Sequence, residues 1–153
     1  MLHYLNAARS SEKALSLPRA ALLWSPWVDL TRCSGQGRIP SPSRHGLPLR
    51  ELGRNNRSQF NLTLPGDKFA YISPLRNEFY SPTPVFVQTG TAELFYEDHM
   101  QFARGMENRG TKVEMVEILN APHDTFGAGM LVGFAKEAED AARRAAKFVD
   151  AAV

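Results

Sequence analysis

Glu93 and His123 are the two residues of this sequence whose types and positions could support acid–base chemistry. Glu93 follows residues 84–90, a short apolar and β-branched run with the pattern of a strand buried on both faces. His123 follows residues 112–118, whose alternating side chains also indicate a strand. A carboxylate that orients a histidine supplies two of the three groups of a hydrolytic triad.

The segment between these residues predicts how they could meet. Residues 97–109 are helix-like, and Gly110 occupies the position of a C-cap glycine. A strand, a helix and a second strand in this order predict a right-handed βαβ unit, whose two loops leave the same edge of a parallel sheet. Glu93 and His123 are therefore expected to approach each other although they are far apart in the sequence.

The remaining segments predict an α/β fold with a parallel sheet. Residues 20–25 read as a third buried strand, residues 1–14 as the last turns of a helix, and residues 131–152 as an amphipathic helix. Residues 32–82 are rich in Gly, Pro, Ser, Asn and Arg and lack periodicity. We predict one domain over residues 1–153: a helix and strand (1–31), a lid-like insertion (32–82), and the acid and histidine loops with a C-terminal helix (83–153).

Composition excludes several classes of protein. With 153 residues, 43% of them hydrophobic, the chain is expected to form one core. Cys33 is the only cysteine, which excludes an internal disulfide and multi-cysteine metal sites. His3, His45 and His99 lack ligand partners at metal spacing, so we expect neither metal nor cofactor. No apolar run approaches the roughly 20 residues of a membrane span, and no secretory signal is visible, which favours a cytoplasmic location.

Four ordered segments resemble the C-terminal half of α/β-hydrolases of the hormone-sensitive-lipase-like esterase branch. The segments are AALLWSPWVDLT (20–31), YISPLR (71–76), VFVQTGTAELFYEDHMQF (85–102) and VEMVEILNAPHDTF (113–126). The resemblance implies a partial α/β-hydrolase fold with about three parallel strands, and a serine esterase or lipase acting on a small ester.

The resemblance also assigns roles and exposes a gap. The family's catalytic acid falls on Glu93, where Asp is more common, and its catalytic histidine falls on His123. Asp124 stands where the family commonly has Gly. Neither the Gly-x-Ser-x-Gly elbow of the nucleophile nor the upstream oxyanion motif occurs in the sequence. We therefore expect an N-terminally truncated domain that is inactive as this chain alone.

Alternatives remain open beside this interpretation. Glu97 and Asp98 compete with Glu93 for the acid role, although they are more typical of the solvated first turn of a helix. A non-enzymatic interaction module could self-associate through an exposed sheet edge. The arginines between residues 32 and 57 could bind nucleic acid, but their irregular spacing and few interleaved aromatic residues disfavour that partner.

Overall fold

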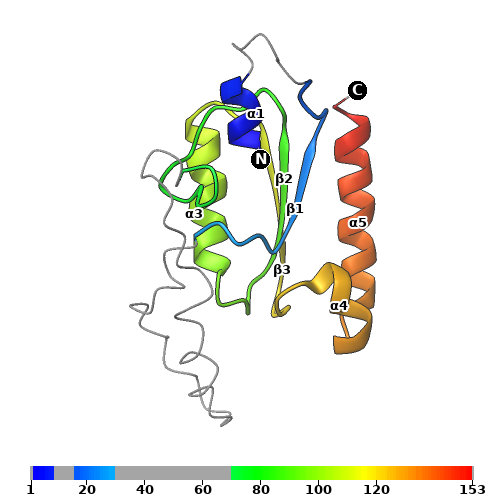
Figure 1. Ribbon diagram of the computed structural model, residues 1–153. Helices are drawn as coiled ribbons and strands as arrows, with labels where there is room; N and C mark the ends of the chain where they lie inside the picture. The colour runs from blue at the N-terminus through cyan, green and yellow to red at the C-terminus, as the bar shows by residue number, and fades with distance from the viewer. Residues whose placement is uncertain (1, 9–15, 30–69, 153) are drawn as a thin grey trace.

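A computed structural model describes residues 2–8, 16–29 and 70–152 (Figure 1). Its elements follow in the order helix, strand, strand, helix, strand, helix, helix. They are α1 (Leu2–Ala8), β1 (Ala21–Trp24), β2 (Val85–Gly90), α3 (Tyr96–Asn108), β3 (Val113–Ile118), α4 (Thr125–Val132) and α5 (Ala135–Asp150).

The three strands form one parallel sheet in the order β1-β2-β3. Leu22 of β1 lies beside Phe86 of β2, which lies beside Glu114 of β3. All six residues of β2 are buried, as expected for the central strand of a parallel sheet that is covered on both faces. The predicted α/β class and the three parallel strands are confirmed.

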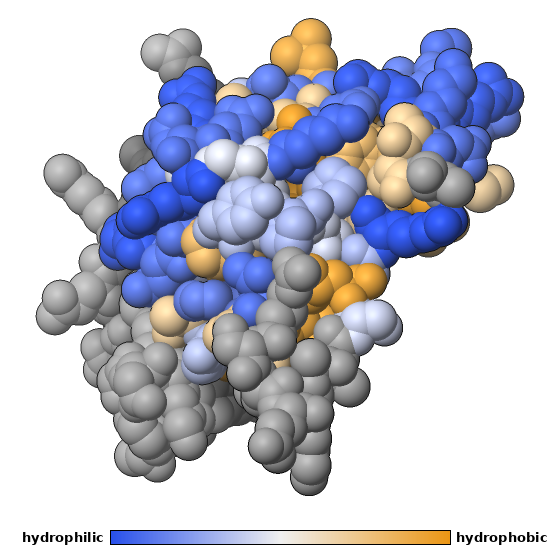
Figure 2. Space-filling view, turned by 90° about the horizontal axis from the view of Figure 1, so that it is seen from above, coloured by the Kyte–Doolittle hydropathy of each residue, from blue (hydrophilic) through white to orange (hydrophobic). Residues whose placement is uncertain are grey.

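Helices cover both faces of this sheet (Figure 1). Side chains alternate along β2, so Val85 and Val87 pack toward α3 while Phe86 packs toward α5. The core on the first face includes Val85, Val87, Phe102 and Met106, and the core on the second includes Phe86, Val116, Ala141, Ala145 and Phe148. The end of the molecule at which the strands begin, opposite the α4 end, is covered mostly by hydrophilic residues with smaller hydrophobic patches between them (Figure 2).

The prediction of a single C-terminal helix over residues 131–152 is wrong at its start, because two helices meet there. Gly133, with φ of +86°, ends α4, and α5 begins at Ala135. A left-handed glycine is a common helix terminator because it carries no Cβ. Helix α4 escaped prediction because its sequence, TFGAGMLV, is almost uniformly apolar and has no helical periodicity.

Several predictions fall on residues that the structure does not describe. Most of the insertion at 32–82, Cys33, His45 and the arginines at 32–57 lie outside the described residues. Within the described ranges, no helix has the length and apolar character needed to cross a membrane.

Candidate active site

The loops that follow β2 and β3 lie against each other at the carboxyl ends of the strands. The amide N–H of Ala92 donates to the carbonyl of Ala121 at 3.1 Å, and that of Asn120 donates to Oγ1 of Thr91 at 2.8 Å. At Gly90 the approach is so close that a Cβ would lie 2.2 Å from the carbonyl oxygen of Ala121. Glycine is therefore required where β2 passes the histidine loop.

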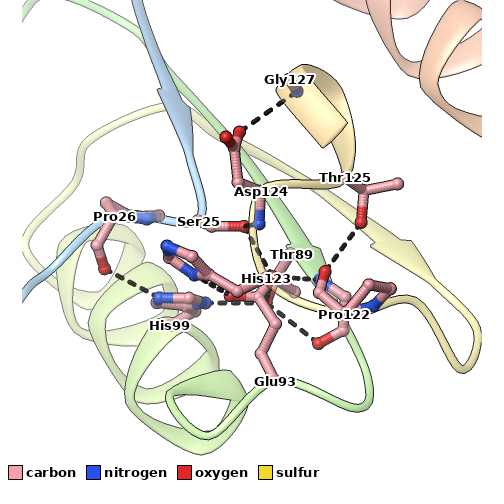
Figure 3. A network of polar contacts seen from close by, with 11 residues as sticks. Ser25, Pro26, Thr89, Glu93, His99, Pro122, His123, Asp124, Thr125 and Gly127 are labelled. Carbon is pink, nitrogen blue, oxygen red and sulfur yellow. Dashed lines mark hydrogen bonds and ion pairs between the residues drawn. The ribbon is translucent and has the colours of Figure 1, made fainter. Parts of the chain in front are cut away.

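The carboxylate of Glu93 is buried between these loops (Figure 3). Its Oε1 accepts hydrogen bonds from Oγ of Ser25 and from the amide of Gly90, both at 2.6 Å. Its Oε2 lies 2.9 Å from Nδ1 of His123. A buried carboxylate needs such donors because it has lost its hydration.

His123 faces the carboxylate with one nitrogen and remains accessible elsewhere. Its side chain is 53% exposed, whereas that of Glu93 is 0% exposed. Because a carboxylate oxygen accepts, Nδ1 of His123 carries a proton, and the neutral ring leaves the lone pair on Nε2. Nε2 has no hydrogen-bond partner among the described residues. The arrangement can take a proton from a group placed beside Nε2.

Asp124 turns the chain directly after His123 and begins α4. Its φ of 55° and ψ of 46° are left-handed, and its side chain accepts the amide N–H of Gly127 at 3.2 Å. Left-handed backbone favours Gly but is tolerated by Asp and Asn. This conformation explains why Asp can stand at a position where a glycine is expected.

The second histidine of the site, His99, is fully buried on α3 behind the acid (Figure 3). Its Nε2 lies 2.7 Å from the carbonyl oxygen of Pro26, which can only accept, so Nε2 is protonated. Its Nδ1 lies 2.7 Å from Oγ1 of Thr89, whose hydroxyl donates to the neutral ring. Burial lowers the pKa of His99, while the nearby carboxylate of Glu93 opposes this shift.

A model of the family described as the α/β-hydrolase fold matches residues 1–127. The chain belongs to the α/β-hydrolase family. This membership confirms the fold that the four sequence segments predicted. No protein with a curated function matches the sequence.

Solved esterase and lipase structures share the fold of this α/β-hydrolase chain. An esterase/lipase from an uncultured bacterium superposes with a TM-score of 0.70 and 18% identity, covering 99% of this chain and 48% of its own. A hormone-sensitive lipase from a metagenome library superposes with a TM-score of 0.66 and 19% identity, over 97% of this chain and 50% of the lipase. A hyperthermophilic esterase from the archaeon Pyrobaculum calidifontis superposes with a TM-score of 0.67 and 18% identity, over 96% of this chain and 47% of the esterase. The chain thus spans about half the length of these structures.

Residues of this α/β-hydrolase site differ in how readily the sequence indicates them. The structure brings Glu93 and His123 together, whereas Glu97 and Asp98 lie in the first turn of α3. The expectation that this turn is solvated is wrong for Asp98, which is only 2% exposed. His99 and Ser25 were not predicted as parts of the site; for Ser25, its place directly after β1 was the available signal.

The parts of the chain that the structure describes contain no cluster of side chains suited to bind a metal ion. There, no group of three or more His, Cys, Asp or Glu residues is arranged to hold an ion. His3 stacks on Phe79 with ring centroids 4.3 Å apart, which is a packing contact.

Proposed function

We propose that Glu93 and His123 are the acid and the base of a carboxylic-ester hydrolase of the serine type. The observation that carries this proposal is the 2.9 Å contact between Nδ1 of His123 and a buried carboxylate oxygen of Glu93. Similarity to esterase and lipase structures supports the same reaction class. The resemblance to the hormone-sensitive-lipase-like branch makes a small carboxylic ester the proposed substrate.

In such a mechanism each member of the pair has a defined task. Nε2 of His123 takes the proton of an attacking serine hydroxyl and later returns a proton to the departing alcohol. Glu93 holds the proton on Nδ1, which fixes the tautomer, and stabilises the imidazolium cation formed during the reaction. The exposure of His123 beside the buried Glu93 suits this division, because only the base must reach the substrate.

The nucleophile is the group that this sequence does not provide. None of its serines has glycine two positions before and two positions after it. Ser25, although close to Glu93, is 3% exposed and its hydroxyl donates to the carboxylate. We therefore propose that this chain alone has negligible esterase activity, because both the nucleophile and its oxyanion-hole motif are missing.

Hydrolysis of p-nitrophenyl acetate and p-nitrophenyl butyrate by the purified chain tests this proposal. We expect the rate to exceed that of a His123→Ala variant by no more than the slow, non-saturable hydrolysis that an exposed imidazole supports. Saturable turnover that His123→Ala abolishes would show that the chain has its own nucleophile. If a longer form encoded upstream of the Met1 codon carries a serine elbow, His123→Ala should lower its kcat by about a thousandfold or more.

A second candidate function, self-association, is favoured by the edge of the sheet. Among the described residues β1 pairs only with β2, and Leu22 on that strand is 37% exposed. An apolar cavity of about 340 Å³ lies beside β1 and is also lined by residues of α1 and α3. An unpaired edge next to apolar surface can accept a strand of another chain. Light scattering that finds a folded monomer at every concentration would exclude this function.

A further inference from the structure

Ser25 occupies an unusual backbone position directly after β1. Its φ is +43°, in the left-handed region that residues other than Gly rarely adopt. Its amide donates to the carbonyl of Gln88 at 2.9 Å, so pairing with β2 holds this backbone in place. Its side chain is enclosed between the acid and histidine loops, and the residue is 3% exposed (Figure 3).

The hydroxyl of Ser25 makes two hydrogen bonds that reach different loops. Oγ donates its one proton to Oε1 of Glu93 at 2.6 Å. The same oxygen accepts the amide N–H of Asp124, the residue after His123, at 3.1 Å. One hydroxyl oxygen directly after β1 is therefore hydrogen-bonded both to the candidate acid and to the backbone that carries the candidate base.

We propose that Ser25 is a positioning residue that holds the carboxylate of Glu93 and the imidazole of His123 in register. This role rests on the proposed function of the pair, and it adds a part that neither the motif nor the family match assigns. With Ser25 and the amide of Gly90 both donating to Oε1, Oε2 is the oxygen that remains for Nδ1. The carboxylate cannot rotate without breaking two bonds to a charged acceptor.

The backbone conformation separates this role from ordinary packing. Glycine would adopt the φ of Ser25 without steric cost, but it would leave Oε1 with one strong donor fewer. Threonine would keep the donor, but its branched Cβ would add strain at a positive φ. The glycine variant therefore relieves the backbone strain but loses the hydrogen bond, whereas the threonine variant adds strain but keeps the hydrogen bond.

Nuclear magnetic resonance of the 15N-histidine-labelled chain tests the proposal without any substrate. The signals of His123 are assigned by their absence in a His123→Ala variant. We expect the Nδ1 proton to exchange with water about tenfold faster or more in Ser25→Gly and Ser25→Ala, because the loss of one hydrogen bond to a charged group frees the carboxylate. Ser25→Thr should keep the slow exchange even if it lowers the free energy of unfolding.

Ser81→Ala is the matched control. Ser81 is also buried, at 2% exposed, and its hydroxyl accepts the amide N–H of Thr83, ahead of the start of β2. This control should leave the exchange of the His123 proton unchanged. The proposal is overturned if the Gly variant retains the wild-type exchange rate and tautomer, or if Ser81→Ala has the same effect. Because no turnover is measured, an absence of esterase activity would affect neither the measured exchange rate nor the measured tautomer of His123.

Discussion

Nδ1 of His123 lies 2.9 Å from Oε2 of Glu93, although the two side chains differ sharply in solvent exposure. The carboxylate is enclosed and accepts donors from three directions, whereas about half of the imidazole is accessible. A buried charge is tolerated only where its hydrogen bonds are made. The buried charge of Glu93 therefore acts on one exposed group, the imidazole of His123. In the role proposed for it, His123 needs such a partner, because the carboxylate orients the ring while Nε2 stays accessible.

Replacing Glu93 by glutamine should reverse the tautomer of His123. The glutamine oxygen can still accept from Ser25 and Gly90, so its amide NH2 would face Nδ1, which must then become an acceptor. We expect the ring proton to move from Nδ1 to Nε2, as read from the two 15N chemical shifts of His123. Glu97→Gln is the control, because Glu97 is an exposed residue in the first turn of α3. An unchanged tautomer in Glu93→Gln would contradict this account of the pair.

How much of this arrangement the sequence predicts depends on the kind of contact. The positions of β2, α3 and β3 follow from local patterns, and the shared edge of a parallel sheet then brings Glu93 near His123. The contacts of His99 with Pro26 and Thr89 depend on how α3 packs against the sheet, which no local pattern encodes. Helix α4 was missed for a different reason, because a uniformly apolar segment shows no face.

Replacing Gly90 by alanine should destabilise the fold at the junction of the two loops. The new Cβ would lie 2.2 Å from the carbonyl oxygen of Ala121, a backbone atom that cannot rotate away. We expect a loss of about 2–3 kcal/mol in the free energy of unfolding, the upper range for overpacking, measured by urea denaturation. Gly133→Ala is the control: φ is +86°, but no atom beyond the neighbouring residues of the chain lies within 4 Å of the added Cβ, so only the backbone strain of about 1 kcal/mol remains. Equal losses in both variants would show that the close approach is not what requires glycine at position 90.

Substitutions of Asp124 should separate its backbone strain from its helix cap. Asp124→Asn keeps an acceptor for the amide of Gly127 and tolerates the left-handed backbone, so we expect little change in stability. Asp124→Ala loses the cap and keeps the strain, which should cost about 1–2 kcal/mol in urea denaturation. Asp124→Gly loses the cap but relieves the strain, and its stability should fall between those of the other two variants. An alanine variant as stable as the asparagine variant would show that the cap contributes nothing.

Acid should destabilise the chain partly through His99. Burial lowers its pKa below the ordinary 6.5, so as the pH falls the unfolded chain binds a proton that the folded chain refuses. Stability should therefore be unaffected by this group above pH 6.5 and should decrease as the pH falls from 6.5 toward the lower folded pKa. In His99→Gln, which can still donate to the carbonyl of Pro26 but does not titrate, we expect a smaller loss of unfolding free energy between pH about 7.5 and about 5.5. Glu93, Asp98 and His123 are the titratable groups that act on His99, and they remain in the variant. The difference between the two urea series therefore reports the protonation of the buried His99 ring. Identical losses in wild type and variant would show that protonation of His99 does not oppose folding.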